Sequence, residues 1–208
     1  MSVSRTVLIA AIVVLVVAGV VAAAVFLPGV LSPGTKEFQA ADVPFTFEYP
    51  SGWRTVTKEN RGEFGFDEED GIPEKYDVLA VASRDGDSVF LLGVGRLPGD
   101  KELDQESWDK LKQVARDSTN RKLDELRNEG LQVEGPRIED ESVGSFRAVT
   151  IYSTYHKGSA GSADGQVFID AGRTRYVLDY LHMSTAWNGD GATFDEIVDS
   201  LEEKKPEN

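Results

Sequence analysis

Residues 76–94 read YDVLAVASRDGDSVFLLGV, and this stretch decides the fold class. Two apolar runs, Tyr76–Ala82 and Val89–Val94, have the length and the β-branched content of strands. The segment Arg84–Asp87 separates them, and its Asp-Gly step is typical of a tight hairpin turn. Strands joined by so short a turn must run antiparallel, because a parallel connection needs a dozen or more residues. The stretch therefore predicts an antiparallel sheet.

Further strand patterns lie on both sides of this hairpin. Phe45, Phe47 and Tyr49 alternate with polar residues and predict a half-buried strand that ends at Pro50. The other predicted strands are residues 53–57, 132–138, 146–155, 165–171 and 175–182. Residues 158–162 and 171–173 are rich in Gly and Ser and predict the turns between the last three strands.

One long segment has helical spacing instead. Apolar residues recur every three or four positions from Gln105 to Asn128, with Asp104 as the expected N-cap and Gly130 as the stop. A second, short helix is predicted around Phe194, because the next apolar residues fall on the same stripe. Strands outnumber helices and are joined by turns. We therefore expect an α+β fold with a central antiparallel sheet flanked by helices, and not a doubly wound parallel sheet.

The amino-terminal segment Val7–Leu27 has the composition of a membrane span. It contains no charged residue, and 14 of its 21 residues are Leu, Ile, Val or Phe. As a helix it would be roughly 32 Å long, close to the thickness of the hydrocarbon core of a bilayer. We expect an uncleaved signal anchor, and a signal peptide cleaved after Ala24 is the alternative. The lipid bilayer is the first partner that the sequence predicts.

The expected topology follows from the few charges that flank this span. Arg5 precedes it, whereas the first cation after it is Lys36. We expect residues 1–6 to form a short cytoplasmic tail and residues 28–36 to form a tether. Residues 37–203 are then one globular domain outside the cytoplasmic membrane, followed by a disordered tail at residues 204–208.

The composition excludes several classes of function. The chain has 22 Lys and Arg against 36 Asp and Glu, so its formal net charge is −14. This excess argues against nucleic-acid binding and against adsorption to anionic headgroups, since both need clustered cations. The chain contains no Cys. Disulfides, thiolate metal sites, a Cys nucleophile and the acylated Cys of a lipoprotein are therefore excluded.

Few residues suggest chemistry. His156 and His182 are the only histidines, and the sequence lacks a nucleophile elbow, a P-loop, a zinc-protease motif and a dinucleotide fingerprint. We therefore expect no catalytic residue and no cofactor.

Two other features are candidate sites. The run Asp67, Glu68, Glu69 and Asp70 is a candidate weak calcium loop, although it lacks EF-hand spacing and also fits a solvated loop. Trp187 lies in a polar stretch and is a candidate contact residue for a partner.

Two parts of the sequence resemble the PsbP-like family. One is the strand and corner FTFEYPSGW at residues 45–53, and the other is RYVLDY at residues 175–180 with the short helix that follows. The resemblance covers most of residues 45–201. The family that the chain resembles includes extracytoplasmic, membrane-anchored members of the actinobacterial type. It implies a PsbP-like α/β/α sandwich and no particular activity.

Together these features predict a membrane-anchored, extracytoplasmic domain that acts as a non-catalytic binding or accessory module. Its expected partner is a protein or another component of the membrane or envelope. Two alternatives remain open: an envelope hydrolase that uses a carboxylate pair or a Ser, and a carrier that holds a lipid or small ligand between sheet and helix.

Overall fold

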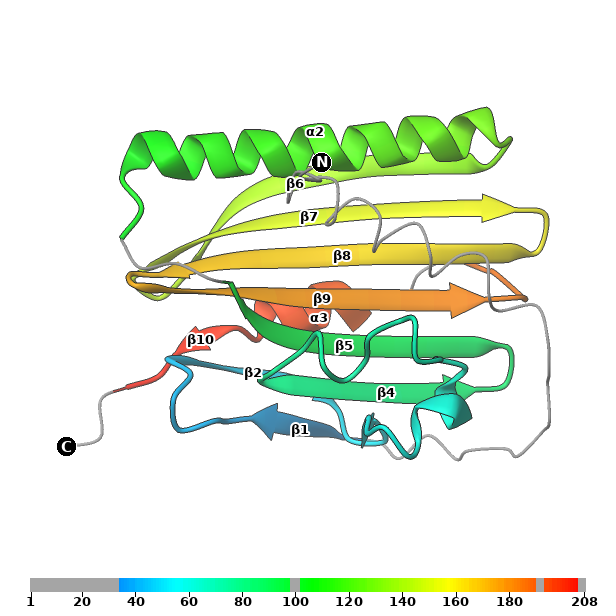
Figure 1. Cartoon of the computed structure of the whole chain (residues 1–208), viewed down its shortest axis with the longest axis horizontal. Coiled ribbons are helices and arrows are strands. Elements are labelled where there is room, and N and C mark those ends of the chain that lie inside the picture. The colour runs from blue at the N-terminus through cyan, green and yellow to red at the C-terminus, as the bar shows by residue number, and fades with distance from the viewer. Residues whose placement is uncertain (1–33, 98–101, 190–192, 206–208) are drawn as a thin grey trace, which may run out of the picture.

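The computed structural model describes residues 34–97, 102–189 and 193–205 (Figure 1). The expected membrane anchor at Val7–Leu27 and all but the last residues of the expected tether lie outside this range. Within it, no helix is both long and apolar enough to span a bilayer.

The centre of the fold is a seven-stranded sheet with the order β3-β4-β5-β9-β8-β7-β6, in which every neighbouring pair is antiparallel. Its strands are β3 (Arg54–Thr55), β4 (Leu79–Asp85), β5 (Ser88–Leu97), β6 (Gln132–Val143), β7 (Phe146–Lys157), β8 (Ala160–Ala171) and β9 (Thr174–Ser184). The predicted hairpin is confirmed as β4 and β5, which turn at Gly86 with a φ of +54°. The prediction of an α+β fold built on an antiparallel sheet is also confirmed.

A second, three-stranded sheet was not predicted. It has the order β1-β2-β10 and consists of β1 (Thr35–Phe38), β2 (Phe45–Pro50) and β10 (Glu202–Glu203). Strand β2 matches the prediction, whereas β1 begins inside the expected tether. The first three residues of β1 are polar and exposed and β10 has only two residues, so neither strand has a detectable apolar pattern. Both β1 and β10 are strands because they pair with β2.

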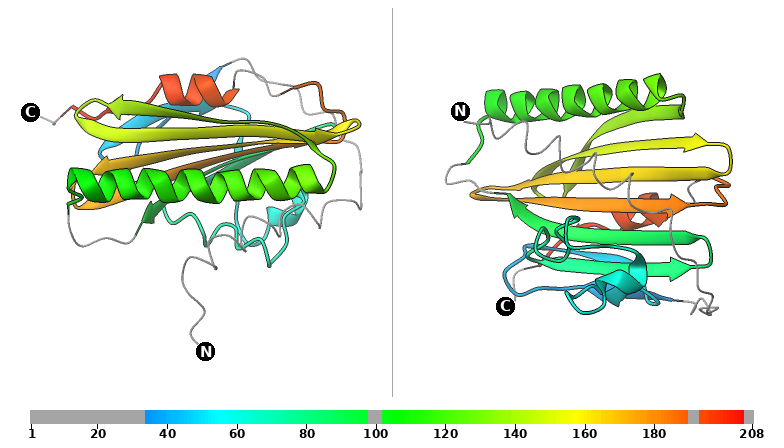
Figure 2. Two further views of the ribbon diagram at one scale, coloured as in Figure 1. Left: turned by 90° about the horizontal axis from the view of Figure 1, so that it is seen from above. Right: turned by 45° about the vertical axis from the view of Figure 1, so that its right-hand side comes forward.

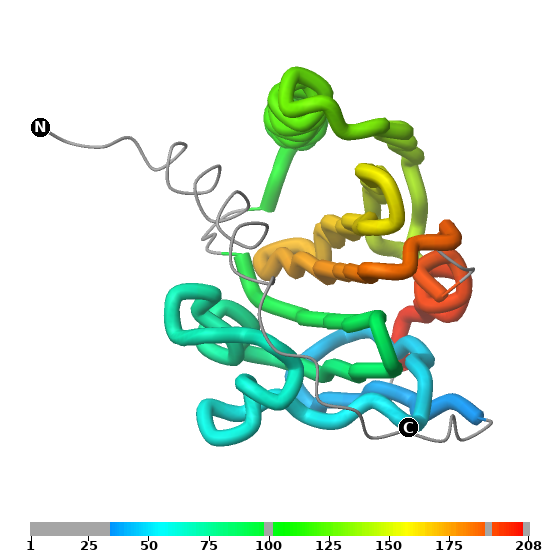
Figure 3. The backbone as a smooth tube through the Cα atoms, turned by 90° about the vertical axis from the view of Figure 1, so that its right-hand side faces the viewer, coloured from blue at the N-terminus to red at the C-terminus, as the bar shows by residue number. Residues whose placement is uncertain are grey.

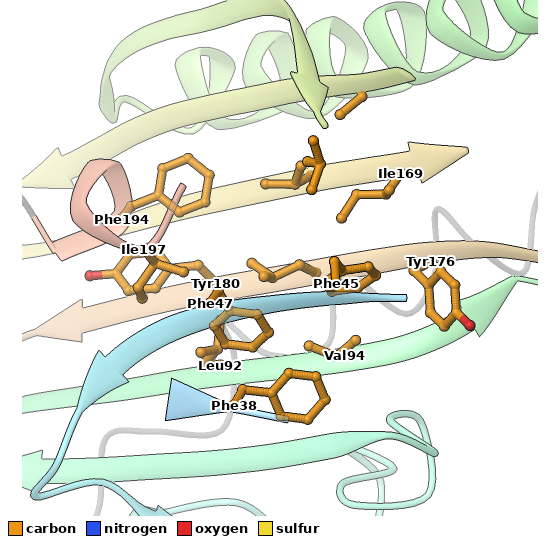
Figure 4. Packing of buried hydrophobic residues seen from close by; sticks show 14 of the residues in the cluster. Phe38, Phe45, Phe47, Leu92, Val94, Ile169, Tyr176, Tyr180, Phe194 and Ile197 are labelled. Carbon is orange, nitrogen blue, oxygen red and sulfur yellow. The ribbon is translucent and has the colours of Figure 1, made fainter. Parts of the chain in front are cut away.

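This small sheet and the helix α3 (Thr193–Asp199) cover one face of the main sheet, which we call the core face. Alternate residues of the main sheet, such as Leu92 and Val94, pack there against Phe45 and Phe47 of β2 (Figure 4). The layer on this face is thus part sheet and part helix, where the sequence predicted helices alone.

Phe194 fixes α3 to the core face. Its ring lies 5.2 Å from the ring of Tyr152 and 5.4 Å from that of Tyr180, measured between centroids, and only 1% of the residue is exposed. Gly165 lies directly beneath it. A Cβ atom on Gly165 would stand 2.5 Å from the Phe194 ring, so this position of β8 has to be glycine for α3 to dock.

The opposite face, which we call the helix face, carries α2 (Gln105–Asn128) and the segment 56–76 with the short helix η2 (Arg61–Phe64) (Figure 2). The predicted bounds and cap of α2 are confirmed, and the Asp104 carboxylate accepts a hydrogen bond from the Ser107 N–H at 2.7 Å. Seen along the strands, α2 and segment 56–76 lie apart on the same side of the sheet, and α3 lies on the other (Figure 3).

The first turn of α2 is tied to the sheet through Arg147 of β7. Its guanidinium forms an ion pair with Asp170, donates a hydrogen bond to the Leu103 carbonyl at 2.8 Å and stacks over the Trp108 ring at 5.1 Å. The side chain of Asp170 is only 4% exposed. A buried carboxylate needs such a partner, because an unpaired charge in a protein interior is strongly unfavourable.

Several predicted strand limits were wrong. β3 has two residues in place of five, β6 extends to Val143, and β8 begins at Ala160 although residues 158–162 were predicted as a turn. Small residues such as Gly161 carry no apolar signal, yet they lie in the sheet where large rings pack on them. A Cβ on Gly161 would collide with the ring of Trp187.

Candidate functional site

The helix face holds two carboxylates, Asp164 of β8, which contacts Lys122 of α2, and Asp179 of β9, which contacts Lys75 of segment 56–76. Asp179 lies opposite Gln166 in the sheet register, and Asp164 is two residues from Gln166 on the same face. The two aspartates are therefore diagonal neighbours, a relation that corresponds to about 7–8 Å between residues. Their side chains are 25% and 13% exposed.

Both oxygens of Asp179 are occupied. The Gln166 amide donates a hydrogen bond to Oδ1 at 2.8 Å, and the Lys75 ammonium lies 3.2 Å from Oδ2. Lys75 also lies over the ring of Tyr76, 4.8 Å from its centroid. Burial, with a further contribution from the charge of Asp179, raises the pKa of Tyr76 well above its usual value. The Tyr76 hydroxyl therefore stays protonated at neutral pH.

Asp164 has an equivalent set of partners from α2 and β7. Its Oδ2 pairs with the ammonium of Lys122 and accepts a hydrogen bond from the Tyr155 hydroxyl at 3.1 Å. Lys122 stands 5.2 Å from the centroid of the Tyr155 ring. Burial, followed by the charge of Asp164, raises the pKa of Tyr155. Each aspartate thus interacts with one lysine and one tyrosine.

Each carboxylate of this cluster is already engaged by one ammonium and by a neutral donor. The paired carboxylates of glycosidases act as a general acid and as a base or nucleophile. A general acid must donate a proton to its substrate, whereas the oxygens of Asp164 and Asp179 accept from neighbouring groups. The ordered ammonium, amide and hydroxyl groups are instead a fixed set of hydrogen-bond donors.

The sequence did not single out this cluster. A signal was nevertheless present, because Asp164 and Asp179 are charged residues within segments rich in apolar and small residues. A charged residue inside a buried strand needs a partner, and that requirement could have marked both positions. Their lysine partners lie in other elements, and only the folded sheet brings them together.

Trp187, the predicted contact residue, is half-buried at one end of the sheet. Its ring packs on Gly161 and lies 5.3 Å from the ring of His182, while its backbone N–H donates to the Ser159 carbonyl at 2.6 Å. The residues on either side, 185–186 and 188–189, are exposed. One part of the indole is therefore used to hold the loop on the sheet, which leaves the rest for contact with a partner.

The acidic run at Asp67–Asp70 forms a closed turn. The Asp70 carboxylate accepts a hydrogen bond from the Asp67 N–H at 2.7 Å, and the Asp67 carboxylate accepts one from the Glu69 N–H at 2.8 Å. Glu68 pairs with Arg61 at 2.8 Å. Burial raises the pKa of Asp70. These bonds use oxygens that a calcium ion would need, and the described part of the chain contains no group of three or more residues placed to hold a metal.

The two histidines are held apart by the sheet. His156 lies on β7 opposite Gly161 of β8, whereas His182 lies on β9 with its ring stacked 4.1 Å from that of Phe90. Strand β8 separates them.

A cavity of about 290 Å³ lies elsewhere, beside the small sheet, where Val43, Phe146 and Lys204 are among its lining residues. This position differs from the space between sheet and helix that a ligand carrier was predicted to use.

No family model matches the chain, and no curated protein matches it. Its structure is similar to the solution structure of cyanobacterial PsbP (CyanoP) from Synechocystis sp. PCC 6803, with a TM-score of 0.48, 16% identity, and coverage of 88% of this chain and 98% of that one. It is also similar to LpqN, involved in cell envelope biogenesis of Mycobacterium tuberculosis, with a TM-score of 0.43, 17% identity, and coverage of 81% and 90%. A crystal structure from Bacteroides thetaiotaomicron gives a TM-score of 0.41 at 11% identity, over 82% of this chain and 49% of that one. A PsbP protein is therefore among the solved structures to which this chain is similar.

Proposed function

We propose that this protein is a membrane-anchored, extracytoplasmic module that binds a component of the membrane or envelope without catalysing a reaction. One observation carries the proposal: Asp164 and Asp179 are each held by a lysine on the helix face. Charges that are fixed in this way offer a partner ordered donors and acceptors.

The connection to the proposed anchor supports a position close to the lipid. The Gly34 carbonyl accepts a hydrogen bond from the Ser51 N–H at 3.1 Å, so the folded domain already begins at this residue. Seven residue steps separate Gly34 from Leu27, and they span no more than about 25 Å when fully extended. A tether of this length confines the domain to a thin layer above the bilayer and raises its effective concentration for neighbours there.

The topology can be tested directly because the chain contains no Cys. We expect an Asn188→Cys variant to react with a membrane-impermeant maleimide in intact cells, since residue 188 is exposed. A Ser4→Cys variant should react only after lysis. Labelling of residue 4 in intact cells, or of residue 188 only after lysis, would overturn the proposed orientation. Loss of an amino-terminal tag from the mature chain would show that the anchor is cleaved.

Binding can be tested by photocrosslinking in cells. A photoreactive residue at Gln166, beside Asp179 on the helix face, should capture a discrete partner that remains in the membrane fraction. The matched control is the same residue at Arg173, which lies on an exposed turn of the same sheet. Identical products from both positions, or none above background under several growth conditions, would contradict a binding role for this face.

A further inference from the structure

Strand β6 leaves one edge of the main sheet open. It is the last strand in the sheet order, and β7 is its only neighbour among the described strands. Its residues 139–142 are all exposed. Successive residues of a strand point to opposite faces, so four exposed residues in a row mean that neither face is covered at this edge. The backbone groups that point outward from such an edge are free to pair with another strand.

This edge lies on the far side of the sheet from the proposed tether. The described domain begins at Gly34, whose carbonyl is hydrogen-bonded to Ser51. Ser51 lies three residues before β3, which is the opposite edge strand. Six strand spacings separate β3 from β6, which amounts to about 29 Å. Figure 3 shows β1 and β2 at one side of the molecule and β6 with α2 at the other. If the domain is tethered as proposed above, the open edge therefore faces the aqueous compartment.

The charges along this edge determine what can pair with it. Glu139 and Glu141 point to one face of β6 and Asp140 to the other. Asp140 pairs with Lys112 at 2.9 Å but stays 71% exposed, so the edge remains acidic. Two copies of β6 paired antiparallel about Asp140 would bring their acidic residues together. A second copy of this chain is therefore a poor occupant, because like charges across a strand pair are destabilising.

We propose that residues 137–143 of β6 bind an extended, basic segment of a partner protein as an eighth strand of the sheet. The partner's backbone would pair with the open edge, and its cations at alternate positions would lie opposite Glu139 and Glu141. The binding free energy then comes from the backbone hydrogen bonds, and the selection of the partner comes from charge. That a partner in the aqueous compartment can reach this edge rests on the proposed function, because it assumes the proposed tether. The shape and charge of the edge do not depend on that assumption.

The test uses the full chain in vesicles of phosphatidylcholine, which carry no net charge. The probe is a short fluorescent peptide that alternates lysine with valine, and its binding is followed by anisotropy. We expect the double variant Glu139→Lys/Glu141→Lys to weaken binding about tenfold or more, because two attractive cross-strand pairs become repulsive. The matched control Glu37→Lys/Glu102→Lys changes the net charge equally at other exposed positions and should leave the affinity unchanged.

A second probe separates strand pairing from simple charge attraction. The same peptide with every backbone nitrogen methylated keeps its charges but has no N–H to donate to a strand edge, so it should not bind. Equal weakening by both double variants, equal binding of the methylated peptide, or no binding of the parent peptide would each overturn the proposal. Failure of the chain to float with the vesicles would instead refute the anchor, and peptide binding in detergent would then still test the edge.

Discussion

The packing of Phe194 on Gly165 predicts that a Gly165→Ala substitution destabilises the domain. The new Cβ would stand 2.5 Å from the Phe194 ring, which is enclosed by Tyr152 and Tyr180 and has no room to move. Overpacking of this kind costs about 1–3 kcal/mol. Alanine is otherwise favoured over glycine in a strand by roughly 0.5–1 kcal/mol, so the free energy of unfolding should fall by about 1–2 kcal/mol.

Urea unfolding of residues 34–208, followed by circular dichroism, measures this loss. Gly62→Ala is the matched control, because a Cβ on Gly62 would meet no atom within 4 Å, and its effect should stay within about 0.5 kcal/mol. Phe194→Ala removes the obstructing ring and should itself cost about 3–5 kcal/mol. In that background Gly165→Ala should be neutral or stabilising. An equal cost of Gly165→Ala in both backgrounds would refute the steric explanation, as would a cost no larger than that of Gly62→Ala.

Two further predictions concern buried polar groups. Arg147→Met leaves the carboxylate of Asp170 buried without its cation and should lower the free energy of unfolding by about 3–5 kcal/mol. Arg54→Met removes an exposed ion pair and should cost at most about 1 kcal/mol in the same urea assay, so equal effects would contradict the role of burial. The raised pKa values of Tyr76 and Tyr155 predict an alkaline loss of stability. Above about pH 10 the unfolded chain releases these protons and the folded chain retains them, so stability falls as the pH rises. In a titration followed by tyrosinate absorbance, both residues should ionise only as the domain unfolds, and their ionisation in the folded state would contradict this.

The elements that the sequence predicted well are those whose signals are local. Helix α2 begins after its cap at Asp104 and ends just before Gly130, which has a φ of +84°, because capping and period are set by neighbouring residues. The hairpin of β4 and β5 was found for the same reason, since its turn residues lie between its own two strands.

The features that escaped prediction depend on distant parts of the chain. Gly161 and Gly165 have a role only because Trp187 and Phe194 pack on them. The ion pairs of the helix face also join distant segments. Asp179 pairs with Lys75, and the whole of α2 lies between these two residues in the sequence. Sequence patterns report periodicity within a segment and contain little information about which segments meet. The membrane anchor, the partner contact at Trp187 and the calcium loop stay predictions.

Strand β10 gives this domain a particular order of assembly. Glu202 pairs with Thr46 and Glu203 with Phe45, so the strand β2 is completed by residues almost 160 positions further along the chain. A contact between such distant segments forms late, because it closes almost the whole chain into a loop. A polypeptide that is made amino end first therefore leaves β2 without this pairing until residue 203 has been added. The small sheet can be completed only after that point, and until then the apolar strand β2 depends on its other contacts for cover.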